Sequence, residues 1–155
     1  MQKVYHELKP IYNKDSEILI LGSIPSVKSR EEKFYYAHKQ NRFWPLMESL
    51  FQVTLKTKEE KIEFLLTHHI ALWDVVASCE IENSRDDSIH NVKCNDILNL
   101  MKQTKIHKIF TTGKKATNLY QKYIYPQTKI PSIYLPSPSP ANCRMKHAEL
   151  EKIYS

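Results

Sequence analysis

Short apolar runs alternate with amphipathic stretches along most of the chain. The first run, EILILGS at residues 17–23, has the length and continuous hydrophobicity of a buried strand. In NRFWPLMESLFQ, at residues 41–52, apolar side chains recur at helical spacing around a proline suited to a first turn. The same pattern predicts strands at residues 17–23, 70–76, 108–113 and 132–137. It predicts helices at residues 41–52, 58–69, 95–103, 114–124 and 143–154, with Asn95 as a candidate N-cap.

The order of these elements indicates the fold class. Strands that alternate with helices form a parallel sheet with helices on both faces, so we expect an α/β fold. No repeat, linker or low-complexity tract divides the chain, and residues 1–155 are expected to form one domain. The polar segment at residues 78–96 is expected to be a loop.

Functional residues are expected at one edge of this sheet, because ligands of open α/β sheets bind outside the carboxyl ends of the strands. Gly22, Asp74, Gly113 and the segment LPSPSP all fall at such ends. Gly22 indicates either a close approach of another group to the backbone or a sharp turn. For Gly113 we favour the turn.

Basic residues dominate the C-terminal third of the chain. The net charge is +6, and no Asp or Glu lies between Asp96 and Glu149. The cations of that span are Lys102, Lys105, Lys108, Lys114, Lys115, Lys122, Lys129, Arg144 and Lys146. They indicate a footprint for phosphates, because cations that bind a polyanion release its counterions. A lysine-rich solvated surface is the competing interpretation.

Cysteine usage and hydropathy indicate the compartment. Cys79, Cys94 and Cys143 are widely spaced and form no CxxC motif, which favours reduced thiols in a cytoplasm over a zinc or iron–sulfur site. No apolar run has the length of a membrane span, and the N-terminal MQKVYHELKP lacks the apolar centre of a signal peptide. We expect a cytoplasmic protein that does not enter a membrane.

Four segments, LGSIP, YYAHKQNRFWPLM, ALWDVVASC and LPSPSPAN, together resemble the uracil-DNA glycosylase superfamily. The tandem of YYAHxxNRFW and LPSxSPAN is most similar to its DNA-deoxyinosine (hypoxanthine) glycosylase branch. The resemblance implies a three-layer α/β/α sandwich around a four-stranded parallel sheet. It also implies a monomeric DNA repair enzyme that flips out and excises a deaminated base, leaving an abasic site, without metal or organic cofactor. Hypoxanthine is favoured over uracil or xanthine.

A flipped base needs an aromatic surface with polar groups around it. Tyr36 stands where relatives place the stacking ring, and a tyrosine packed in the core is the competing interpretation. The expected base pocket comprises Gly22, Ser23, Ile24, Pro25, Tyr36, His38 and Asp74. For His38 and Asp74 a structural role is the stronger alternative, and Tyr35, Phe43 and Trp44 are expected to pack in the core. Ile24 replaces the polar side chain found in the GQDP and GINP motifs of relatives, which disfavours uracil excision of the usual type.

Asn41 is the expected principal catalytic residue. Its amide offers both a donor and an acceptor, which suffices to position water or the base edge without titrating. Because Asn41 precedes RFWPLM, a helix N-cap is the open alternative.

The second motif, LPSPSPANCR, supplies the remaining candidates. Ser137 stands where relatives place a histidine or asparagine that stabilises negative charge on the departing base, and we expect it to be catalytic. The expected DNA-binding residues are Ser139, Asn142, Arg144 and Lys146. They would contact phosphates or enter the space left by the flipped nucleotide. Asn142 is also suited to a helix N-cap.

Other classes of function remain as alternatives. A uracil or mismatch glycosylase and a non-catalytic binder of damaged DNA share most of the same features. A nucleotide-binding module is disfavoured because no GxGxxG or P-loop follows the first strand. A serine hydrolase is disfavoured because no GxSxG motif is present.

Overall fold

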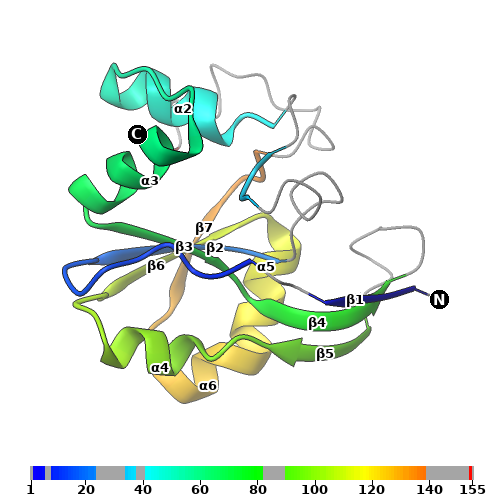
Figure 1. Ribbon diagram of the computed structural model, residues 1–155. Coiled ribbons are helices and arrows are strands. Elements are labelled where there is room, and N and C mark those ends of the chain that lie inside the picture. Colours follow the sequence, from blue (N-terminus) through cyan, green and yellow to red (C-terminus); the bar gives the residue numbers. More distant parts are fainter. Residues whose placement is uncertain are drawn as a thin grey trace.

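A four-stranded parallel sheet forms the centre of the molecule. The structure is a computed structural model that describes residues 2–5, 8–23, 34–37, 41–81, 90–138 and 154 (Figure 1). The sheet has the strand order β3-β2-β6-β7. Its strands are β2 (Ile18–Gly22), β3 (Ile70–Asp74), β6 (Lys108–Thr112) and β7 (Ser132–Leu135). The predicted parallel sheet is confirmed.

Helices cover both faces of this sheet (Figure 1). Side chains alternate along β2, so that Leu19 and Leu21 join one hydrophobic core and Ile18 and Ile20 pack in the other. The first core is completed by α4 (Ile97–Lys102), α5 (Lys114–Leu119), the π-helical turn η2 (Tyr120–Ile124) and α6 (Tyr125–Thr128). The second is completed by α2 (Phe43–Phe51) and α3 (Lys58–Thr67). The expected three-layer α/β/α sandwich is confirmed.

A second, antiparallel sheet extends from the carboxyl end of β3. It has the order β1-β4-β5, with β1 at Gln2–Tyr5, β4 at Val76–Ile81 and β5 at His90–Cys94. The prediction of a loop over residues 78–96 is therefore wrong for most of the positions that the structure describes. The sequences VASCEI and HNVKC lack the continuous apolar run by which the buried strands are predicted, because these strands belong to a peripheral sheet.

Side chains fix where the helices begin. The Thr57 hydroxyl accepts a hydrogen bond from the Glu60 backbone N–H, and the Glu60 carboxylate accepts one from the Thr57 N–H, which forms a capping box at α3. At α4 the N-cap is Asp96, so the prediction of Asn95 is wrong by one residue. The helix predicted at residues 143–154 lies outside the described residues, apart from Tyr154. No helix among the described elements is long and apolar enough to cross a membrane.

Candidate active site

Polar side chains from neighbouring strands meet at the carboxyl edge of the parallel sheet. Gly22 and Asp74 are paired residues at the ends of β2 and β3. A methyl group placed on Gly22 would lie 2.5 Å from Asp74 Oδ1 and 3.8 Å from Thr112 Oγ1, at the end of β6. The edge at which ligands are expected thus carries a carboxylate and a hydroxyl that converge on one glycine.

Gly22 is required because Asp74 approaches it closely. No side chain fits at 2.5 Å from a carboxylate oxygen, whereas Gly22 has no positive φ angle that would demand glycine. Asp74 is only 5% exposed, and its backbone carbonyl accepts a hydrogen bond of 2.8 Å from the Asn95 side chain. Of the two interpretations of Gly22, close approach is the correct one.

Tyr36 has a backbone conformation that bulky residues rarely adopt. Its φ angle is 53°, in the left-handed region. A non-glycine residue held there costs on the order of 1–3 kcal/mol, and such residues cluster at functional sites. The ring stacks on Phe43 with 4.1 Å between the ring centroids and 14° between the planes. One face of Tyr36 is therefore covered by the core.

The hydroxyl of Tyr36 lies in the same cluster as Asp74 and Thr112. Burial and the nearby Asp74 carboxylate raise the pKa of Tyr36, and a hydrogen bond with the Thr112 side chain acts in the opposite direction. The net shift of the pKa is upward, so the phenol keeps its proton at neutral pH. Tyr36 can therefore act as a hydrogen-bond donor at this edge.

The neighbouring aromatic residues are buried, as predicted. Tyr35, Phe43 and Trp44 are all at most 4% exposed. The Tyr35 hydroxyl donates to the Lys9 carbonyl at 2.8 Å, and Trp44 Nε1 donates to the Tyr35 carbonyl at 3.0 Å. These bonds anchor the segment that carries Tyr36 to the core.

Asn41 has the capping interaction that competes with a catalytic role. Its Oδ1 accepts a hydrogen bond of 2.9 Å from the Phe43 N–H, which stabilises the first turn of α2, although Arg42 itself occupies the N-cap position. A carbonyl oxygen has a second lone pair, and this bond leaves the amide Nδ2 unused. The capping interaction is thus compatible with a second role.

The two motif segments of the site are in direct contact. The backbone N–H of Arg42 donates to the Pro138 carbonyl at 3.0 Å. The Tyr154 hydroxyl donates to the Pro136 carbonyl, and burial raises the pKa of that hydroxyl. Asn41 and Ser137, which are far apart in the sequence, therefore belong to segments that meet beside the same sheet edge.

Ser137 packs against Gly113. A methyl group on Gly113 would lie 3.3 Å from Ser137 Cβ, and the Gly113 N–H donates to the Leu135 carbonyl at 2.7 Å. Gly113 has a φ angle of 89°, which confirms that this glycine serves a turn. The turn places the half-buried Ser137 next to the end of β6.

The remaining candidates divide by whether the structure describes them. Ser23 is half-buried at the end of β2, and its carbonyl accepts a hydrogen bond of 3.1 Å from Val76. The candidates outside the described residues are Ile24, Pro25, His38, Ser139, Asn142, Arg144 and Lys146.

Thr112 is a site residue that the sequence reasoning missed. It is 8% exposed and lies near Asp74 at the strand ends, where its Oγ1 would be 3.8 Å from a methyl group on Gly22. The signal that identified Asp74, a polar residue closing an apolar strand, is also present in KIFTTG.

The basic residues of the C-terminal third do not form one continuous footprint. Lys114 and Lys115 begin α5 directly after Gly113, beside the candidate site. By contrast, Lys102, Lys105, Lys108 and Lys129 lie at or before the amino ends of β6 and β7. Within the described residues, Lys114 and Lys115 therefore lie beside the candidate site, whereas the other four lysines lie toward the opposite end of the sheet.

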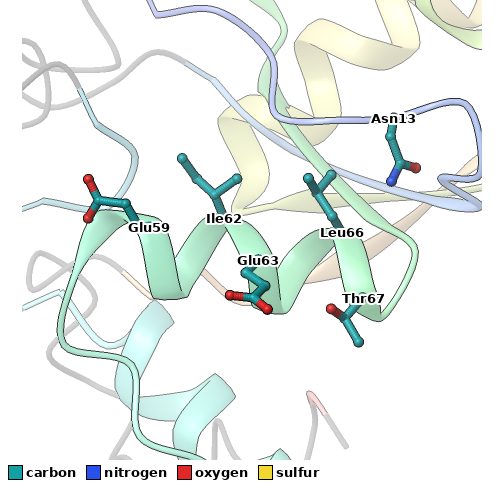
Figure 2. A pocket seen from close by; sticks show the side chains of 6 residues that line it. All are labelled: Asn13, Glu59, Ile62, Glu63, Leu66 and Thr67. Atoms are coloured by element: carbon teal, nitrogen blue, oxygen red, sulfur yellow. The ribbon is translucent and has the colours of Figure 1, made fainter.

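An open hollow of about 500 Å³ lies elsewhere, on α3 (Figure 2). It is lined by Asn13, Glu59, Ile62, Glu63, Leu66 and Thr67. Because Asn13 precedes β2 and Thr67 precedes β3, the hollow lies toward the amino ends of the strands. Its two carboxylates repel a polyanion, so this hollow is not the candidate site. Among the described residues, no three His, Cys, Asp or Glu side chains gather in a way that could hold a metal ion.

Comparisons with known proteins agree with this arrangement. The family model of the uracil DNA glycosylase superfamily matches residues 9–155. A hypoxanthine DNA glycosylase from Methanosarcina acetivorans is 33% identical over 93% of this chain and 94% of its own length. A hypoxanthine DNA glycosylase from Methanosarcina barkeri is 31% identical over 69% of this chain and 70% of its own length.

A solved structure has a similar fold over nearly the whole chain. The solution NMR structure of a candidate uracil DNA glycosylase from Methanosarcina acetivorans superposes with a TM-score of 0.80. It has 31% sequence identity and covers 95% of this chain and 94% of its own. The sheet and its two helical layers are thus those of an enzyme family that acts on N-glycosyl bonds in DNA, and the chain belongs to the uracil DNA glycosylase superfamily.

Proposed function

We propose that this protein is a monofunctional DNA glycosylase that hydrolyses the N-glycosidic bond of deoxyinosine and releases hypoxanthine. The observation that carries the proposal is the convergence of Tyr36, Asp74 and the two motif segments on one sheet edge. This edge occurs in a chain that is 31–33% identical to two hypoxanthine DNA glycosylases. An abasic site remains in the DNA.

The base must leave the duplex before its glycosidic bond is accessible. Phe43 covers one face of the Tyr36 ring, so the flipped base stacks on the opposite face. Lys114 and Lys115 hold the phosphates near this edge through their charge. The stacking energy of the extruded base offsets part of the cost of unstacking it from its neighbours.

Asp74 provides a basis for choosing a deaminated base. Hypoxanthine carries an N–H next to its carbonyl, where adenine has a bare ring nitrogen. A carboxylate oxygen accepts from that N–H and repels the lone pair of adenine, so Asp74 favours the deaminated base over its parent. Uracil and xanthine carry the same N–H group, and the choice among these bases depends on the shape of the pocket.

Bond cleavage places positive charge on the sugar and negative charge on the base. Asn41 positions the attacking water through the free lone pair of its carbonyl and the Nδ2 group. The Ser137 hydroxyl donates to the base as its negative charge develops. The contacts with DNA that the sequence predicts remain predictions, and they involve Ser139, Asn142, Arg144 and Lys146. A monomer in the cytoplasm also stays a prediction.

Uracil is the second candidate substrate, because the similar solved structure is described as a candidate uracil DNA glycosylase. The test is a cleavage panel of duplex and single-stranded oligonucleotides that contain inosine, uracil, xanthine or a thymine mismatch. We expect release from inosine to be fastest. Release of uracil alone would contradict the proposal that hypoxanthine is the base released. Tight binding of inosine DNA without release of the base would identify the protein as a non-catalytic binder of damaged DNA.

A further inference from the structure

Asn95 donates hydrogen bonds to three consecutive backbone carbonyls, of which the first belongs to Asp74. It lies between the end of β5 and the N-cap of α4. Its Nδ2 donates to the Asp74 carbonyl at 2.8 Å and to the Val76 carbonyl at 3.4 Å. Its backbone N–H donates to the Val75 carbonyl at 2.9 Å. One asparagine therefore holds the 74–76 segment from one side.

The strand β2 holds the same segment from the other side. The Val75 N–H donates to the Gly22 carbonyl at 2.8 Å. The Val76 N–H donates to the Ser23 carbonyl at 3.1 Å. The 74–76 segment connects β3 with β4, so it is fixed on two sides where the chain leaves the parallel sheet.

The position of this segment decides where the Asp74 carboxylate lies. Asp74 is only 5% exposed, and a methyl group on Gly22 would lie 2.5 Å from its Oδ1. A carboxylate packed so closely moves when its own backbone moves. Because a hydrogen bond weakens steeply when it is misaligned, recognition of a base N–H needs this carboxylate at a fixed place.

We propose that Asn95 is a positioning residue, which holds the backbone of Asp74 so that its carboxylate meets the N–H of the deaminated base. The effect on the choice of base rests on the proposed function. The effect on the backbone of Asp74 does not rest on it. Asn95 acts through Asp74.

Two substitutions remove the side-chain donors of Asn95. A primary amide carries two N–H groups on one nitrogen, which suits two carbonyl acceptors. Asn95→Asp keeps the shape of the side chain and removes both donors, and Asn95→Ala removes them without adding charge. Asn99→Asp is the matched control, because this exposed residue of α4 undergoes the same change in charge.

Amide hydrogen exchange measures the backbone without DNA. We expect the N–H groups of Val75 and Val76 to exchange about tenfold faster in both Asn95 variants, because the 74–76 segment opens more often. The N–H of Leu72, within β3, should exchange as in the wild type. Equal acceleration at Leu72 would show a general loss of stability and overturn a local role.

The affinity for DNA measures the choice of base. Deoxynebularine has a bare ring nitrogen where deoxyinosine has the N–H, and a fluorine at C2′ of either nucleotide slows loss of the base. We expect the wild type to bind inosine DNA about tenfold more tightly than nebularine DNA, and the Asn95 variants to lower this ratio about threefold. Loss of folded protein weakens both affinities equally and leaves the ratio unchanged. In an Asp74→Ala background, Asn95→Ala should not change the ratio, because Asn95 acts through that carboxylate.

The outcomes separate this inference from the proposed function. Wild-type exchange at Val75 and Val76 in both Asn95 variants, or a wild-type affinity ratio in both, would overturn the positioning role. A wild-type protein that prefers inosine DNA and releases no hypoxanthine would refute the proposed enzyme and leave the role of Asn95 standing. Equal wild-type affinity for the two DNAs would refute recognition of the base by Asp74 and with it the effect of Asn95 on the choice of base.

Discussion

At the residue scale, the function of Asn41 depends on which atoms of its amide are occupied. Oδ1 accepts from the Phe43 N–H at 2.9 Å, so the residue stabilises the start of α2 whatever else it does. Loss of activity in an alanine variant would therefore mix two effects. A useful substitution must keep the acceptor that caps the helix and remove the amide donor.

Asn41→Asp meets this requirement. Aspartate caps a helix as well as asparagine does, so we expect the melting temperature of Asn41→Asp to stay at the wild-type value. Release of hypoxanthine should fall about a hundredfold, the usual effect of removing one donor from a preorganised site. The measurements are thermal unfolding and single-turnover excision.

Asn41→Ala is the matched control. It removes the cap as well, which costs about 1 kcal/mol and lowers the melting temperature by about 2–4 °C. If Asn41→Asp and Asn41→Ala both release hypoxanthine at the wild-type rate, Asn41 has only the capping role.

At the scale of elements, the site depends on the register between β2 and β3. This register sets Gly22 beside Asp74, with space for no side chain between them. The apolar pattern predicts both strands, and their parallel order places both residues at one edge. The distance of 2.5 Å between a methyl group placed on Gly22 and Asp74 Oδ1 follows only from the pairing of the two strands.

Gly22→Ala tests this contact. The new methyl group must displace Asp74, so we expect a loss of about 1–3 kcal/mol in the free energy of unfolding, as for overpacked cores. Release of hypoxanthine should fall because Asp74 no longer faces the base.

The double variant Gly22→Ala/Asp74→Ala distinguishes crowding from other effects of the substitution. Removal of the carboxylate should restore part of the lost stability without restoring activity. A single Gly22→Ala variant with wild-type melting temperature and activity would show that the close approach of Asp74 is not what requires glycine.

At the scale of the whole molecule, the lysines of the C-terminal third lie at two opposite ends of the parallel sheet. Lys114 and Lys115 lie at the carboxyl end, next to the turn that packs on Ser137. Lys102 and Lys129 lie at the amino end and are exposed. Lys105 is paired there with Asp15 at 3.3 Å. The net charge attracts DNA to the whole molecule, whereas specific phosphate contacts are expected at one end only.

Two charge-matched double variants test this division. Lys114→Gln/Lys115→Gln should weaken binding of inosine DNA and reduce the slope of log affinity against log salt by about one for each lost phosphate contact. Lys102→Gln/Lys129→Gln, with the same net charge, should leave that slope unchanged. Fluorescence anisotropy at several salt concentrations gives both values. Equal slopes for the two variants would contradict a footprint at the carboxyl edge.

The sequence by itself determined the parallel sheet, its two helical layers and the segments that carry the site. Those features depend on local hydrophobic periodicity and on the rule that parallel strands end at one edge, both of which are visible in residue order. The peripheral sheet is missed because its strands lack a continuous apolar run, and because β1 pairs with β4, which is distant in the sequence. Asp96 replaces Asn95 as the cap of α4 because Asn95 is drawn to the Asp74 carbonyl by a tertiary contact.

Only the tertiary structure decided how the site is assembled. It shows that the close approach of Asp74, and not a turn, requires glycine at position 22, and it places Thr112 in the candidate site. It also divided the lysines between two ends of the sheet. Each of these outcomes depends on distances between residues far apart in the chain, which are set by strand register and packing. Residue types and spacing indicate which groups are available for chemistry, and the packed fold determines which of them meet.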